Sequence, residues 1–113
     1  MIRGEIWLAE FGIPYGTEAG YTRPVLIVQD DSFNKSRIKT IVILPLTTNL
    51  RLSEAPGNVL LRKEEINLPK DSVIMAAQLY AIDRCRFIKK LAKVSNEIME
   101  QVESGMKLVL GIN

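Results

Sequence analysis

Short apolar runs separated by turn-forming residues fill the first 94 positions, and this pattern constrains the fold more than any other feature of the sequence. The runs with strand character lie at 5–11, 24–29, 40–44, 58–62, 72–77 and 87–94. They are short enough to be strands, and clusters of Gly, Pro, Asn, Asp and Ser lie between them. Pro45 is expected to close the third run. Six short strands in so small a chain predict a compact, strongly bent sheet or a small barrel.

The C-terminal segment is the one part of the chain with a clear helical pattern. Ser95 is suited to cap the helix N-terminus, and Glu97 lies in the first turn, where the helix dipole favours an acid. The apolar residues that recur at helical spacing are Ile98, Val102, Met106 and Val109. Gly105 interrupts this helix at a cost of about 1 kcal/mol relative to alanine. The predicted fold class is therefore mainly β with a C-terminal α-helix.

Length and composition predict one soluble domain over residues 1–113. Hydrophobic residues make up 47% and charged residues 25% of the chain, which is ordinary for a globular protein. No apolar run is long enough to span a membrane. Cys85 is the single cysteine, so an internal disulfide is excluded and a cytoplasmic location is expected. A core this small favours additional burial by self-association.

Charge is unevenly distributed along the chain. The net charge is +2, but residues 1–94 hold 14 of the 15 basic and 10 of the 13 acidic residues. The last 19 residues are net acidic. A mildly basic body is compatible with a small nucleic-acid enzyme, although many ordinary domains share it.

The sequence contains no histidine. This removes the usual side chain for proton transfer near neutral pH and excludes His-based catalytic triads. One cysteine and no histidine cannot build a common zinc site. The acidic pairs Asp30-Asp31 and Glu64-Glu65 lie beside turn signals, and we interpret them as solvated turn acids. We therefore expect neither a metal nor a cofactor.

Cleavage of RNA by its own 2′-hydroxyl suits the residue types that remain. The reaction needs no external nucleophile and no metal ion, but it needs aligned reacting atoms and cationic stabilisation of the phosphorane. Arginine donates to two phosphate oxygens at once. A threonine hydroxyl is able to hold the phosphate or the attacking oxygen.

Four segments of the chain resemble the MazF/PemK family of toxins. They are Arg3-Gly-Glu-Ile-Trp7, then 16–29 (GTEAGYTRPVLIVQ), 40–48 (TIVILPLTT), and 71–78 (DSVIMAAQ) continuing to Ile82-Asp83-Arg84. The match covers nearly the whole chain in order. The resemblance implies an SH3-like small β-barrel that works as a homodimer. It also implies the toxin of a type II toxin–antitoxin system, an endoribonuclease that cuts single-stranded mRNA to leave 2′,3′-cyclic phosphate and 5′-hydroxyl ends. A cognate antitoxin is the implied protein partner, and the toxin–antitoxin complex is expected to reach promoter DNA through that antitoxin.

The same resemblance assigns candidate site residues. Arg23 corresponds to the family's catalytic arginine and Thr47 to its catalytic threonine. Arg23 comes just before one predicted strand and Thr47 just after the next, so antiparallel pairing would bring them to one end of the sheet. The candidates for contacts with RNA are Thr17, Glu18, Tyr21, Thr22, Thr48, Asn49 and Gln78, and the loop 12–22 is a candidate lid.

Several positions depart from the family pattern or allow another interpretation. Some PemK-like members use a first-loop histidine and an Arg/Asp pair, where this chain has Thr17, Met75 and Ala77. Tyr80 stands where relatives often carry a basic residue. Thr47 could serve only its own turn, and Gln78 could hold buried backbone groups. Trp7 is expected in the core or a dimer interface and Cys85 to be inert. The basic residues expected to form a solvated face are Arg84, Arg86, Lys89, Lys90 and Lys93.

Two other functions remain compatible with these residues. One is a CcdB-like toxin that inhibits a protein such as gyrase without catalysis, on a related barrel. The other is a barrel that binds nucleic acid without cutting it. Cleavage of a long RNA, with and without EDTA, distinguishes all three.

Overall fold

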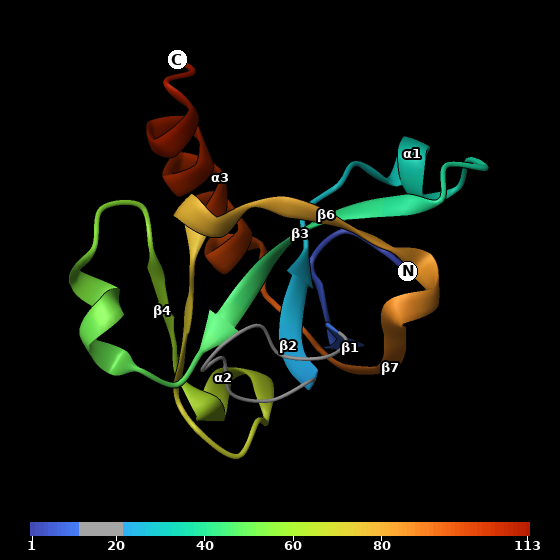
Figure 1. Ribbon diagram of the computed structural model, residues 1–113. Helices are drawn as coiled ribbons and strands as arrows, with labels where there is room; N and C mark the ends of the chain where they lie inside the picture. Colours follow the sequence, from blue (N-terminus) through green and yellow to red (C-terminus); the bar gives the residue numbers. More distant parts are fainter. Residues whose placement is uncertain (12–21) are drawn as a thin grey trace.

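The protein forms a curled antiparallel sheet with one long helix, as seen in a computed structural model that describes residues 1–11 and 22–113 (Figure 1). The strands are β1 (Glu5–Glu10), β2 (Thr22–Ile27), β3 (Thr40–Thr47), β4 (Val59–Leu61), β5 (Ser72–Ile74), β6 (Tyr80–Asp83) and β7 (Phe87–Lys93). The helices are α1 (Asp31–Asn34), α2 (Lys63–Ile66) and α3 (Asn96–Leu110), with 3₁₀ turns η1 (Leu50–Glu54), η2 (Ala76–Gln78) and η3 (Arg84–Arg86).

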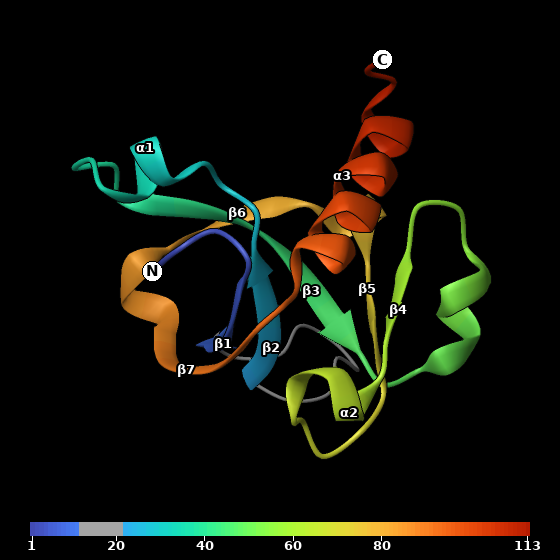
Figure 2. The same ribbon diagram turned by 180° about the vertical axis from the view of Figure 1, so that it is seen from behind.

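The sheet curls because its central strand changes neighbours halfway along. The strand order is β4-β5-β3-β2-β1-β7, with β6 paired to the first half of β3 and β5 to its second half. Two register shifts in the β1–β7 pair add to the bend. The result is a half-barrel with α3 lying across one face, which Figure 2 shows from the helix side. The predicted mainly-β architecture with a C-terminal helix is confirmed.

Each face of the sheet carries its own apolar cluster. The larger cluster joins alternate residues of the strands, such as Leu26 and Leu44, to Ile98, Met99 and Val102 of α3. The smaller one lies on the opposite face and is covered by larger side chains at its edge. Its buried members are Ala9, Val25, Ile27, Ile41, Ile43 and Ile82, and Met1, Trp7, Phe11 and Phe87 pack against them. Trp7 therefore belongs to this cluster, with its indole Nε1 donating to Glu5 Oε1 at 3.0 Å.

Pro45 lies within β3 and does not end it, in contrast to the sequence-based expectation. Its carbonyl oxygen accepts from the Met75 N–H at 3.0 Å, so its nitrogen faces the same side, away from β2. On that side β3 has a gap between its two partner strands. Its pairing with β6 ends at Ile43–Tyr80, and its pairing with β5 begins at Leu46–Ile74. A proline is tolerated there because no ladder hydrogen bond is required of its missing N–H.

Gly105 of α3 is explained by close packing against Gly57. A Cβ at Gly105 would overlap the carbonyl oxygen of Gly57, and Gly57 has φ = +89°. The residue that weakens the helix locally therefore lets the helix approach the segment between η1 and β4. Ser95 caps the helix as predicted, its hydroxyl accepting from the Ile98 N–H at 3.2 Å.

Some elements and side chains differ from the sequence-based expectations. The strand β6 and the short helices α1 and α2 were not predicted. Arg84, expected on a solvated face, is half-buried and donates to the backbone carbonyls of Ile38 and Asn34 at 2.6 and 2.8 Å. Cys85 is exposed. No helix in the described ranges is long and apolar enough to cross a membrane.

Candidate active site

The strand register brings Arg23 and Thr47 together. Antiparallel pairing of β2 with β3 sets Val25 opposite Pro45, Leu26 opposite Leu44 and Ile27 opposite Ile43. Arg23 and Thr47 each lie two residues beyond the Val25–Pro45 pair, at the same end of the sheet, and alternation sets their side chains on the face of Val25 and Pro45. The pairing of β2 with β3 ends at Val25–Pro45, and β3 then pairs with β5 from Leu46, so the two residues lie at the rim of the sheet.

The Thr47 hydroxyl has one bond to its own turn and one hydrogen left to give. Its Oγ1 accepts the backbone N–H of Asn49 at 3.2 Å. Asn49 in turn caps η1, its side-chain oxygen accepting from the Arg51 N–H at 3.3 Å. A hydroxyl carries one hydrogen and two lone pairs, so accepting from Asn49 fixes the rotamer and leaves the O–H to donate. The structural role considered for Thr47 is thus present, and it fixes the orientation of the hydroxyl.

Arg23 lies half-buried at the start of β2, beside Ala9 of β1. The ion pairs within residues 1–11 and 22–113 are Arg3–Glu103 and Lys90–Glu5, so no described carboxylate pairs with Arg23. A cation without a paired carboxylate at a sheet rim favours an anionic ligand, and its planar fork suits a phosphate.

The other predicted contact residues fall into three groups. Thr22, Thr48 and Asn49 are exposed next to Arg23 or Thr47, at the same rim. Thr17, Glu18 and Tyr21, and most of the candidate lid, lie outside the described residues. Gln78 ends η2, which packs against α3 and β3. Its side chain is exposed and makes none of the described side-chain hydrogen bonds, which does not favour the alternative role of holding buried backbone groups.

Two residues that were not among the sequence candidates, Leu60 and Val73, lie in line with Thr47 across the neighbouring strands. Val73 is paired with Thr47 on one side and with Leu60 on the other. Directly opposite residues share a face, so this row runs across the sheet from Arg23 to Leu60. Leu60 remains 37% exposed although its neighbours Val59 and Leu61 are buried. In sequence, the continuous apolar run at 59–61 concealed that its middle residue faces outward.

Within the described ranges, no group of three or more Asp, Glu or Cys side chains is arranged to hold a metal ion. The acidic pairs are turn and helix-terminal acids, as expected. Asp30 accepts from the Ser32 N–H at 3.0 Å as the N-cap of α1, and Glu64 and Glu65 occupy the first turn of α2.

The fold defines a class: a small half-barrel of antiparallel strands with a C-terminal helix, which has Arg23 and Thr47 at one end of its sheet. Residues 2–110 match the family described as PemK-like, MazF-like toxins of type II toxin–antitoxin systems. The chain belongs to this family.

Individual relatives agree with that membership. Endoribonuclease MazF6 of Mycobacterium tuberculosis is 33% identical over 110 residues, which is 97% of this chain and 96% of the relative. Among solved structures, MazF of Deinococcus radiodurans superposes with a TM-score of 0.78 at 22% identity, covering 99% of this chain and 97% of that one. A mycobacterial endoribonuclease in complex with its cognate antitoxin gives a TM-score of 0.77 at 20% identity over 100% and 95% of the two chains. The predicted family, the half-barrel fold and the endoribonuclease class are confirmed.

Proposed function

We propose that this chain is a cytoplasmic toxin that cleaves single-stranded mRNA at the rim formed by Arg23 and Thr47, without a metal ion. The observation that supports the proposal is the β2–β3 register, which puts Arg23, a cation with no described ion-pair partner, and the Thr47 hydroxyl at the same end of two adjacent strands. Family membership supports the substrate class, since similar relatives are named endoribonucleases. The CcdB-like alternative is not favoured, because the matching family is that of PemK and MazF.

The proposed reaction is an in-line attack within the RNA. The 2′-oxygen loses its proton to water and bonds to phosphorus, while the bond from phosphorus to the 5′-oxygen breaks. The leaving oxygen takes up a proton, so the products carry a 2′,3′-cyclic phosphate and a 5′-hydroxyl. With no histidine in the chain to transfer these protons, alignment and charge stabilisation supply most of the acceleration.

Arg23 and Thr47 have different parts in this mechanism. Arg23 donates to the two non-bridging phosphate oxygens, whose negative charge increases in the phosphorane. The Thr47 hydroxyl, already bonded to the Asn49 N–H, donates its one hydrogen to a phosphate oxygen and fixes the phosphate's orientation.

We further propose that the chain is a homodimer in solution and that a cognate antitoxin neutralises it and carries the complex to promoter DNA. Large apolar side chains remain exposed at the C-terminal end of α3: Leu108, Leu110 and Ile112. So small a protein gains stability by burying them against a second copy. Sedimentation equilibrium should give twice the chain mass, and a concentration-independent monomer would contradict the dimer.

The test of the activity is cleavage of a long single-stranded RNA by purified protein, with and without excess EDTA. We expect the same fragments in both reactions. A phosphatase should remove the phosphate from their 3′ ends only after mild acid has opened the cyclic phosphate. Activity that EDTA abolishes and Mg²⁺ restores would contradict the metal-free mechanism. Intact RNA in both lanes would contradict the nuclease itself.

A further inference from the structure

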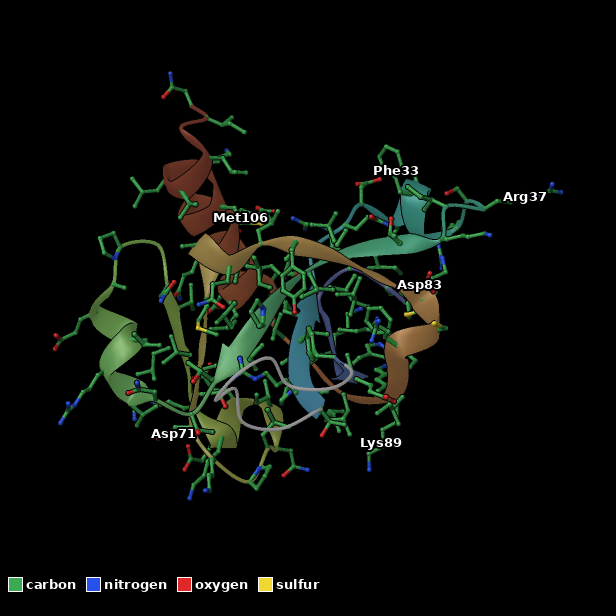
Figure 3. The ribbon with its side chains drawn as sticks, viewed as in Figure 1. Phe33, Arg37, Asp71, Asp83, Lys89 and Met106 are labelled. Carbon is green, nitrogen blue, oxygen red and sulfur yellow. The ribbon has the colours of Figure 1, made fainter. Side chains whose placement is uncertain are left out.

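The connection between β2 and β3, residues 30–39, projects from the sheet at the end opposite Arg23 and Thr47; we call it the basic arm. Its position is clear at the upper right of Figure 1. It adds little to either apolar cluster, since Asn34 is its one buried side chain. Phe33 is 55% exposed, and Figure 3 shows Phe33 and Arg37 pointing away from the sheet.

Hydrogen bonds made by three side chains hold the basic arm in a defined position. Arg84 donates to the carbonyl oxygens of Ile38 and Asn34 at 2.6 and 2.8 Å, and its backbone N–H to that of Lys39 at 2.8 Å. Gln29 and Asn34 exchange two bonds, from Gln29 Nε2 to Asn34 Oδ1 at 3.0 Å and from Asn34 Nδ2 to the Gln29 carbonyl at 2.9 Å. The arm is therefore built as a fixed projection, which is unusual for an exposed connection that packs so little apolar surface.

The basic arm exposes three cations and one carboxylate, that of Asp30. Lys35, Arg37 and Lys39 are exposed, and none takes part in an ion pair within the described ranges. The nearby acids accept hydrogen bonds from neutral groups and keep their negative charge: Asp30 from Ser32, Asp31 from the Arg3 N–H and Asn34, and Asp83 from the Cys85 N–H. Lys35 attracts the carboxylate of Asp31, and Lys39 that of Asp83. Arg37 and Lys39 line one side of an open hollow of about 530 Å³, whose other side is formed by residues 83–85. An exposed aromatic ring among unpaired cations is the combination that binds single-stranded nucleic acid.

The basic arm and the candidate active site lie at opposite ends of β3, and the residues between them on one face of the strand, Ile41, Ile43 and Pro45, are buried. Alternation along the strand sets Lys39, Ile43 and Thr47 on the same face. Tyr80 is paired with Ile43 midway between the ends, is 39% exposed, and lies against the ring of Phe11 with centroids 5.8 Å apart. Lys39 to Thr47 spans about 26 Å at about 3.3 Å per residue, or about eight nucleotides at the stacked spacing of about 3.4 Å.

We propose that the basic arm is a second RNA-binding surface, which holds the single strand about eight nucleotides from the scissile phosphate at Arg23 and Thr47. The arm's cations bind phosphates, and Phe33 supplies a face on which a base stacks. This proposal rests on the proposed nuclease function for its substrate, but its own readout is binding. An RNA with 2′-deoxyribose at the cleavage position cannot be cut, so its affinity is measured whether or not the protein is a nuclease.

The test compares wild-type protein with the triple variant Lys35→Ala, Arg37→Ala, Lys39→Ala. The charge-matched control is Lys89→Ala, Lys93→Ala, Lys107→Ala, on β7 and α3; Figure 3 places Lys89 far from the arm. The affinity of each protein for two uncleavable RNAs is measured over a series of salt concentrations. The long RNA extends about ten nucleotides on both sides of the cleavage position, and the short one about two. Only the long RNA is therefore able to reach from the cleavage position to the basic arm.

For the long RNA, we expect the arm variant to bind about tenfold more weakly. Its slope of log affinity against log salt should fall by about 2, at about 0.7 per lost phosphate contact on a single strand. The short RNA should bind both triple variants as it binds wild-type protein. An unchanged slope for the long RNA would overturn the proposal, as would equal losses for both RNAs. If the arm variant kept the wild-type salt slope but sedimented with a lower mass, the proposal would also be overturned. The arm would then be a contact between copies of the chain.

Discussion

The two ends of the β2–β3 strand pair are built in opposite ways. At the basic arm, the polar side chains of Gln29, Asn34 and Arg84 satisfy one another and the backbone. At the rim, Arg23 has no described ion-pair partner and Thr47 makes one bond to its own turn. Polar groups that satisfy each other stabilise the fold, whereas groups left with unused donors are available to a ligand. Substitutions at the rim should therefore change activity, and substitutions at the arm junction should change stability.

The largest effect is expected from Arg23→Ala. Loss of the contact that stabilises the phosphorane should lower single-turnover cleavage by about two to four orders of magnitude, or about 3–5 kcal/mol. Arg23→Lys should recover little, because one ammonium group does not reproduce a two-pronged contact. Thermal melting should be unchanged in both variants. Cleavage by Arg23→Ala at the wild-type rate would show that Arg23 is an ordinary surface residue.

Thr47 should give the next largest change, again in activity. Thr47→Ala removes the O–H donor and should lower turnover by about ten- to a hundredfold, or about 1.5–3 kcal/mol. Thr47→Ser keeps both the donor and the bond from Asn49 and should retain most of the rate. Thr48→Ala is the adjacent control and should be nearly silent in the same single-turnover assay. Equal losses for Thr47→Ala and Thr48→Ala would mean that the turn, and not the hydroxyl, is what the reaction needs.

Arg84→Ala tests the other end of the comparison. It removes charge-assisted bonds to several carbonyl groups of the basic arm and should reduce the free energy of unfolding by about 2 kcal/mol, since Arg84 is partly solvated. Cleavage of a short RNA should continue at the wild-type rate. The measurements are urea denaturation and single-turnover kinetics on the same preparation. A variant of normal stability that failed to cleave the short RNA would contradict the separation of the two ends.

The smallest effect concerns the acid at the base of the arm. The N–H of Arg3 and the amide of Asn34 hold the pKa of Asp31 below its ordinary value of 3.8. Because the pKa is lower in the folded state, this stabilisation is complete above about pH 3.8 and is lost as pH falls through the folded value. Asp31→Asn should lower Tm slightly near neutral pH, and the difference should close on strong acidification. A difference that widened in acid would contradict this assignment.

Sequence patterns predicted the rim better than the arm, for a physical reason. Arg23 and Thr47 flank two strongly apolar strands, so antiparallel pairing alone was enough to place them near each other. Arg84 reaches carbonyls about 50 positions earlier in the chain, and no local pattern records that contact. β6 was missed because two of its four residues are exposed and it has no continuous apolar run. Pro45 was misjudged because its tolerance depends on a gap between two partner strands.

Gly57 and Gly105 limit how the chain is able to change over evolutionary time. Where a large side chain packs against a small one, a mutation of either residue is often compensated by a change in the other. Here both residues are already glycine, so neither can become smaller. A side chain at Gly105 overlaps the Gly57 carbonyl, and one at Gly57 would require the left-handed backbone and lie 3.1 Å from the Gly105 carbonyl oxygen. At Gly105 the obstructing atoms belong to the Gly57 backbone, so no substitution of a neighbour restores the space. At Gly57 a smaller residue in place of Val109, whose Cγ2 would lie 3.2 Å away, would still leave the Gly105 carbonyl oxygen in contact. The position of α3 relative to the segment that follows Thr47 is thereby fixed. Substitutions elsewhere in the sequence have to be compatible with this contact between Gly57 and Gly105.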